Sequence, residues 1–392
     1  MTSRGAGPPP ASQAPAPAQA TRSRVVFVDV ARALAVLLMI VGHSLNVLLA
    51  PVHQQGDAWN WFMFLRGLTS CTFLLLSGFA FTIASSRYWE AQIRPSRRLA
   101  RRMRRFTFFV ALGYALRWPV DRLEHFAFLT PDRWTYFLIV DVLQCIGVTL
   151  VLLQALVMMS RTPRRFAWAS AAVAVAVGLA TPAVWRIDWT SVVPVGVAAY
   201  LSPGTGSFFP LFPWAAFMFL GASLGHVYVT AWPSDPQAFG RRVLLPGGVI
   251  AIAAALVFAR VPLSPFGPTD PWSTSPNFLA LRAGSVLVGL AVLSHLTSLM
   301  QHLPRVVAAL AQESLLVYFL HLVVLYGSAW NAGARDLLPA PFGPLVAVTG
   351  VAVMLVSMSL LAWGWNWMKR RQRWWAAACK IGVLVAFFLS IR

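Results

Sequence analysis

Arg32 and His43 lie eleven residues apart on the first apolar stretch of this 392-residue chain, in the run RALAVLLMIVGH. Eleven residues turn an α-helix by about 1100°, so the two side chains share one face, about 16 Å apart along the axis. Asp29 precedes Arg32 by one turn, a spacing that permits an ion pair. A charge near the middle of a membrane costs roughly 2.5–3.5 kcal/mol. The stripe of Asp29, Arg32 and His43 therefore predicts a site, although a histidine bonded only to a neighbouring helix is the structural alternative.

A second polar stripe occurs in ESLLVYFLHLVVLY. Ser314, Tyr318 and His321 follow spacings of four and three, so they lie along one side of a helix, and Glu313 adjoins them. Polar residues of this kind also form ordinary hydrogen bonds between membrane helices. The cluster is therefore either a second part of the site or a packing contact.

Ionisable residues inside apolar stretches need partners, because an isolated charge is costly in a membrane. For Glu313 we expect Arg32 or Arg282 as the cation. Arg66 and Arg282 could be structural ion-pair residues, and Asp141 is the acidic candidate for them.

Residues 87–105 form a basic segment with eight arginines against Glu90. One interpretation is an anchor that fixes topology and attracts anionic lipid. Guanidinium groups also match phosphate oxygens well. The segment can therefore receive a soluble polyphosphate donor such as coenzyme A, with binding residues Arg97, Arg98, Arg101 and Arg102.

The elements that position these residues are transmembrane helices. Hydrophobic residues are 58% of the chain, charged residues only 11%, and the mean hydropathy is +0.66, whereas soluble domains carry about 25% charged residues. The apolar runs are long and do not alternate, which argues against a β-barrel. We predict an all-α, polytopic bundle of 10–11 spans. The expected spans are 25–49, 60–85, 106–118, 136–159, 166–184, 208–230, 243–261, 278–300, 306–330, 345–367 and 374–391.

The basic residues behind the net charge of +20 are distributed unevenly between the two sides of these spans. With the amino terminus in the cytoplasm, the inner segments hold 21 Lys and Arg residues against 7 in the outer segments, as the positive-inside rule requires. The charge is thus mostly topological, and we expect no nucleic-acid partner. His43 then lies in the outer half of its span, and Arg32 nearer the cytoplasm.

The domain organisation is simple. Residues 1–24 are rich in Ala and Pro, which predicts a disordered cytoplasmic tail. Residues 25–392 are predicted to form a single integral membrane domain. We expect Cys71, Cys145 and Cys379 to be packing residues, since they fall in apolar runs without metal-binding spacing, and we expect no metal.

Three stretches carry a resemblance to known enzymes: VDVARALAVLLMIVGH at the first span, FPLFPWAAFMFLGASLGH at 209–226 and SLLVYFLH at 314–321. The spacing of Arg32 and His43 resembles the signature of the acyltransferase 3 family of membrane enzymes. The wider set is more similar to the related heparan-α-glucosaminide N-acetyltransferase-like catalytic domains, and LQCIG at 143–147 resembles them more weakly.

The resemblance implies acyl transfer from cytoplasmic acyl-CoA, with acetyl-CoA as the expected donor, to a hydroxyl or amino group of a sugar or other envelope acceptor. Catalysis needs a base for the acceptor and positive charge near the developing oxyanion. His43 fits as general base or acyl carrier, Arg32 as a donor-binding group, and Asp29 as its support. We expect a multi-pass protein of a bacterial inner membrane, in contact with membrane lipid.

Two alternatives remain open at this point. Some relatives use a histidine in the first outer loop, which corresponds loosely to His53, so His53 is the alternative catalytic residue. The second alternative is a transporter or flippase in which Asp29, Arg32 and His43 line a substrate or proton path. The chain has no evident internal repeat, which counts against transport.

Overall fold

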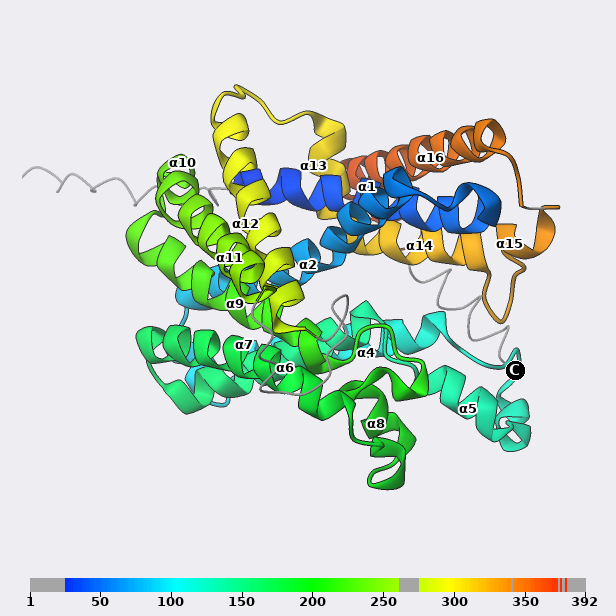
Figure 1. Ribbon diagram of the computed structural model, residues 1–392, viewed down its shortest axis with the longest axis horizontal. Helices are drawn as coiled ribbons and strands as arrows, with labels where there is room; N and C mark the ends of the chain where they lie inside the picture. Colours follow the sequence, from blue (N-terminus) through cyan, green and yellow to red (C-terminus); the bar gives the residue numbers. More distant parts are fainter. Residues whose placement is uncertain (1–24, 261–274, 340, 373, 376–377, 379–392) are drawn as a thin grey trace, which may run out of the picture.

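The computed structural model describes residues 25–260, 275–339, 341–372, 374–375 and 378 (Figure 1). Over these residues the regular structure is helical, apart from two isolated β-bridges, which confirms the predicted all-helical fold. The α-helices are α1 Val26–Leu48, α2 Asp57–Ser86, α3 Glu90–Ile93, α4 Arg97–Leu116, α5 Pro131–Leu138, α6 Val142–Ser160, α7 Pro163–Trp185, α8 Val195–Leu201, α9 Leu211–Ala231, α10 Pro236–Phe239, α11 Leu245–Phe258, α12 Pro276–Ser298, α13 Arg305–Gln312, α14 Ser314–Tyr326, α15 Ala334–Leu337 and α16 Pro344–Arg371.

Four 3-10 turns and one π-helical segment complete the described elements. The π-helical segment, Gly240–Leu244, joins α10 to α11 in one continuous rod. The 3-10 turns are Pro51–His53, Leu123–Phe128, Trp189–Ser191 and Pro203–Thr205.

Eight helical stretches in the described part of the chain are long and apolar enough to cross a membrane, and α13 with α14 gives a ninth that is bent by 77°. The chain is therefore a multi-pass membrane protein. The expected span at 306–330 corresponds to α13 and α14, which are separated by a break at Glu313. The expected span at 106–118 is the second half of α4, an arginine-rich helix that is not among these stretches. The tail at 1–24 and nearly all of the expected span at 374–391 lie outside the described residues.

Helix α1 lies at the centre of the half of the molecule that holds the polar stripes. It contacts α2, α12, α13, α14 and α16, and Figure 1 shows it beside α14 and α16. Its buried face includes Phe27, Val36 and Ile40, each at most 1% exposed. Because α1 and α14 are neighbours, the two polar stripes predicted from the sequence come together.

Helix α2 is held close to α9 by small residues. A Cβ atom on Gly78 would lie 1.8 Å from the carbonyl oxygen of Met218, and one on Gly221 would lie 1.9 Å from that of Leu75. Glycine therefore lets the two backbones touch, as small residues do between membrane helices. This contact fixes the wall of α2 that faces the candidate site.

Helix α4 begins at a capped terminus and packs on α6. The Ser96 hydroxyl accepts a hydrogen bond from the backbone N–H of Leu99 at 3.1 Å, which is an N-cap contact. At the other end Arg117 pairs with Asp141, the residue before α6, with its Nε atom 2.6 Å from the carboxylate. Asp141 is thus the partner of Arg117, and our assignment of it to Arg66 or Arg282 was wrong.

Candidate functional site

A cavity of about 640 Å³ lies between α1, α2, α4, α6 and α14, and we call it the basic cavity. This volume is within the range of small-molecule sites. Within the described part of the chain, no acidic side chain lines it. Its polar lining residues are Arg32, Thr69, Ser70, Ser77, Gln92, Arg98, Arg101, Arg102, Arg105, Ser314 and Tyr318, and its apolar ones include Met39, Phe73, Phe81, Phe106, Val142, Ile146 and Leu315.

The arginines of the basic cavity come mainly from one face of α4. Arg98, Arg101, Arg102 and Arg105 recur at helical spacing and line the cavity, whereas Arg97 does not. Three of the four arginines predicted to bind the donor therefore line this cavity, and the sequence analysis did not name Arg105. Because Arg32 lines the same space, five guanidinium groups line one cavity.

Arg102 is the best anchored of these arginines. One of its terminal nitrogens donates to the Ser85 hydroxyl at 2.7 Å and to the Phe81 carbonyl at 3.3 Å. Its guanidinium carbon lies 4.0 Å from the centre of the Phe81 ring, a cation–π contact. Burial lowers the pKa of Arg102 to about 10, so the group is still charged at neutral pH. Arg102 thus joins α4 to α2 as well as lining the cavity.

The basic cavity extends toward His43. Met39 on α1 and Tyr318 on α14 line it, and His43 and His321 each lie about one helical turn beyond. The ring centres of Tyr318 and His321 are 5.8 Å apart, and those of His321 and His43 are 5.3 Å apart. The two predicted polar stripes therefore meet in a pair of histidines next to the cavity.

Hydrogen-bond geometry distinguishes the two ring nitrogens of His321. Its Nδ1 atom lies 2.8 Å from the carbonyl oxygen of Val317, and only a protonated nitrogen can donate there. The Nε2 atom then carries the lone pair. This atom is buried and has no hydrogen-bond partner among the described residues. His321 is therefore held as a neutral imidazole with a free basic nitrogen.

His43 connects this region to a second cavity, which we call the outer cavity after the side of the membrane that the topology prediction gives it. The Nδ1 atom of His43 lies 3.2 Å from the hydroxyl of Tyr326, and Tyr326 lines the outer cavity of about 440 Å³. The C-terminal ends of α4 and α14 form this cavity, whereas their N-terminal ends form the basic cavity. The other outer-cavity residues are Leu116, Arg117, Trp118, Pro119, Asp132, Arg133, Tyr136, Gly327, Ser328 and Ala329.

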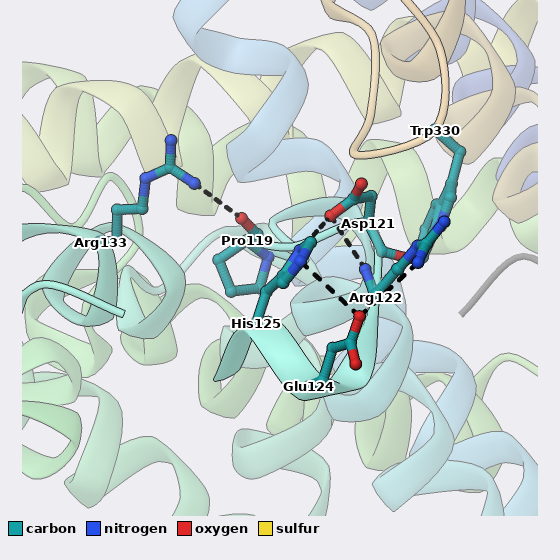
Figure 2. Close-up of polar contacts among 7 residues, drawn as sticks. All are labelled: Pro119, Asp121, Arg122, Glu124, His125, Arg133 and Trp330. Carbon is teal, nitrogen blue, oxygen red and sulfur yellow. Dashed lines mark hydrogen bonds and ion pairs between the residues drawn. The ribbon is translucent and has the colours of Figure 1, made fainter. Parts of the chain in front are cut away.

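The segment between α4 and α5 forms part of the outer cavity and is tied to the loop after α14 (Figure 2). The indole N–H of Trp330 donates to the carbonyl of Asp121 at 3.2 Å. The carboxylate of Asp121 lies 2.7 Å from Nδ1 of His125, and this hydrogen bond lowers the pKa of Asp121. Arg133 donates to the Pro119 carbonyl at 3.4 Å on the neighbouring side. These contacts hold the outer wall in place.

The remaining predicted residues fall in three positions. Asp29 attracts Arg32 electrostatically, in keeping with their spacing of one turn. His53 lies on an exposed 3-10 turn and lines neither cavity. Glu313 is 5% exposed and binds Lys369 of α16 at 2.5 Å. Our expectation of Arg32 or Arg282 as its partner was wrong, because the break after α13 turns Glu313 toward α16.

Sequence reasoning missed the neighbours of His43 that come from other helices. Tyr326 is 283 positions away from His43 in the sequence. Its only local signal is that it follows Ser314 by about three helical turns. Cys71 and Cys145, which we expected to pack in the interior, are buried. Cys379 lies outside the described residues.

Comparison with known families gives one match. The family model described as heparan-alpha-glucosaminide N-acetyltransferase, catalytic, matches residues 24–254, which is more than half of the chain. The matched region contains Arg32, His43 and the arginines of α4. No curated protein matches the chain.

Proposed function

The chain belongs to the heparan-alpha-glucosaminide N-acetyltransferase catalytic family, and on this premise we propose that it moves an acetyl group from acetyl-CoA to a hydroxyl or amino group of a sugar or another envelope acceptor. The observation that carries the proposal is the basic cavity. Five arginines line it and, among the residues that the structure describes, no acidic side chain does. It extends to within one helical turn of His43 and His321. A phosphate-bearing thioester is the kind of donor that such a cavity fits.

In this proposal the donor lies along the basic cavity with its phosphates at α4. Arg98, Arg101 and Arg105 offer their guanidinium groups to the phosphates, which bind such groups strongly. The apolar side chains between α2 and α6 accept the uncharged arm. Arg32 lies deeper along α1 and holds the arm near the thioester, and Asp29 keeps Arg32 in place.

The proposed chemistry takes place at the histidines. His43 accepts the proton of the acceptor hydroxyl or amine as the new C–O or C–N bond forms. The C–S bond of the thioester then breaks, and the proton passes to the leaving thiolate. An acyl group carried for a time on His43 is the second route, and it predicts ping-pong kinetics. His321 has a free Nε2 atom beside His43 and can assist the same proton transfer.

We propose that the acceptor enters through the outer cavity. Tyr326 belongs to its lining and is hydrogen-bonded to His43, so a group bound there lies on the far side of His43 from the donor. Trp118 and Tyr136 offer aromatic faces, and Asp132 offers a carboxylate. These residue types suit a polar ring with hydroxyl groups.

The experiment is thioester consumption by the purified, reconstituted protein. Acetyl-CoA is given on one side of sealed vesicles, and free thiol and acetylated acceptor are measured with a panel of amino sugars. Release of thiol that depends on protein and acceptor supports the proposal. Movement of a solute across the vesicle without thiol release would instead support the transporter or flippase reading of Asp29, Arg32 and His43.

A further inference from the structure

Arg66 is a half-buried cation that the proposed chemistry does not use. It lies inside α2, a helix long and apolar enough to cross a membrane. Among the described residues no carboxylate lies within ion-pair distance of it. Its hydrogen bonds go to Asn46 Oδ1 at 2.9 Å and to the sulfur of Met63 at 3.6 Å. A cation kept in a membrane helix without a counter-charge is a reason to look for a function.

The position of Arg66 places it against the backbone that carries His43. A Cβ atom on Gly42 would lie 2.6 Å from Nε and 2.7 Å from Cδ of Arg66. The arginine therefore lies across α1 at the residue before His43, and it reaches Asn46 one turn further on. Glycine at position 42 leaves the space that this path requires.

Arg66 determines which way the Asn46 amide points. A guanidinium group has only donors, so the atom of Asn46 that faces Arg66 must be the carbonyl oxygen. The amide NH₂ then faces the other way, toward the hydroxyl of Tyr326. The phenol oxygen of Tyr326 thereby has the Asn46 amide on one side, and it lies 3.2 Å from Nδ1 of His43 on the other.

We propose that Arg66 is a positioning residue for the transfer reaction and acts on His43 through Asn46 and Tyr326. The arginine holds the amide beside the phenol, and the phenol oxygen stays against Nδ1 of His43. This leaves Nε2 of His43 for the reacting groups. After His43 has taken up a proton, both of its nitrogens are donors, and Tyr326 is in place to accept from Nδ1. The role rests on the proposed acetyl transfer.

The test compares Arg66→Met, Arg66→Lys, Tyr326→Phe and the double variant Arg66→Met/Tyr326→Phe as purified full-length protein. We measure kcat, the KM for acetyl-CoA with glucosamine as probe acceptor, and the shift in Tm on adding CoA. Arg66→Met should lower kcat about 10²-fold, the usual effect of a misplaced catalytic group. The KM and the CoA-induced shift should not change, and Arg66→Lys should restore part of the rate.

The double variant distinguishes positioning from a general structural effect. If Arg66 acts through Tyr326, the double variant should be no slower than Tyr326→Phe alone. Multiplied losses, or a loss of rate that only follows the folded fraction, would overturn the role. Gly42→Ala is an independent probe, because its methyl group displaces the Arg66 side chain and should give the rate of Arg66→Met.

A second readout does not depend on turnover. Diethylpyrocarbonate modifies unprotonated imidazole nitrogens, and the adducts on His43 can be counted by peptide mass spectrometry. With Tyr326 held against Nδ1, the wild-type histidine should take one adduct, and Arg66→Met should allow two. Equal patterns in both proteins would contradict the positioning role, whether or not the chain acetylates glucosamine. Wild-type protein that consumes no thioester would count against the proposed function alone.

Discussion

Three arginines of α4 provide the most direct test of donor binding. Arg98, Arg101 and Arg105 line the basic cavity and are exposed, so the triple change to glutamine removes their charge with little effect on packing. Arg102 is left unchanged, because its hydrogen bonds to Ser85 and Phe81 also hold α4 on α2. We expect the triple variant to be folded and to bind CoA weakly.

The expected size of the effect follows from exposure. An ion pair at an exposed site contributes at most about 1 kcal/mol. Loss of three such contacts to phosphate amounts to about 2–3 kcal/mol, or a 30- to 150-fold rise in Kd. Since these charges face solvent, salt should weaken CoA binding to the wild-type protein, and the triple variant should show a flatter dependence on salt.

The assay is calorimetric titration of CoA at low and high salt. The matched control changes Arg94, Arg97 and Arg104 to glutamine, because these residues come from the same basic segment and none of them lines the cavity. The control alters net charge equally and should keep most of the affinity. Equal weakening by the two triple variants would refute the cavity as the donor site and leave the segment as a general anchor.

Three further predictions concern stability. Gly78→Leu should destabilise the protein by about 3 kcal/mol or more, seen as a lower Tm in detergent, because any Cβ at this position collides with the α9 backbone; an unchanged Tm would contradict the close contact. Lys369→Met should cost about 1–3 kcal/mol by leaving the buried Glu313 carboxylate without its cation, and Lys369→Arg should cost less; the range allows for Lys369 being 36% exposed. The hydrogen bond from His125 lowers the pKa of Asp121. Their contact should therefore stabilise the outer loop above the ordinary pKa of an aspartate, and this stabilisation should be lost as the pH falls through the lowered pKa. Hydrogen exchange of this loop in the wild type should approach that of Asp121→Asn only in acid.

The sequence allowed the class of fold and the local stripes to be predicted, because both depend on periodicity along one helix. Arg32 and the arginines of α4 were predicted as donor-binding groups, and the basic cavity brings them together. Helical spacing places Arg98, Arg101, Arg102 and Arg105 on one face of the helix. The sequence of a single helix does not show which of its faces lines a cavity.

The partners of the buried charges could not be predicted, since they depend on contacts between helices far apart in the chain. Lys369 meets Glu313 across 56 positions, and Arg117 meets Asp141 where α4 ends beside α6. The break at Glu313 also escaped prediction, because the apolar runs on either side of Gln312, Glu313 and Ser314 are together long enough for one span. Tyr326 then approaches His43 only because α14 lies along α1.

The rate of acetyl transfer by His43→Ala tests the central claim most directly. We expect this variant to be folded, to bind CoA as the wild type does, and to transfer acetyl groups about 10²- to 10⁴-fold more slowly, as loss of a positioned general base predicts. His53→Ala, measured beside it, should lose far less, because His53 lies on an exposed turn outside both cavities. A His43→Ala protein with near-normal rates and an inactive His53→Ala protein would contradict the account and assign catalysis to His53.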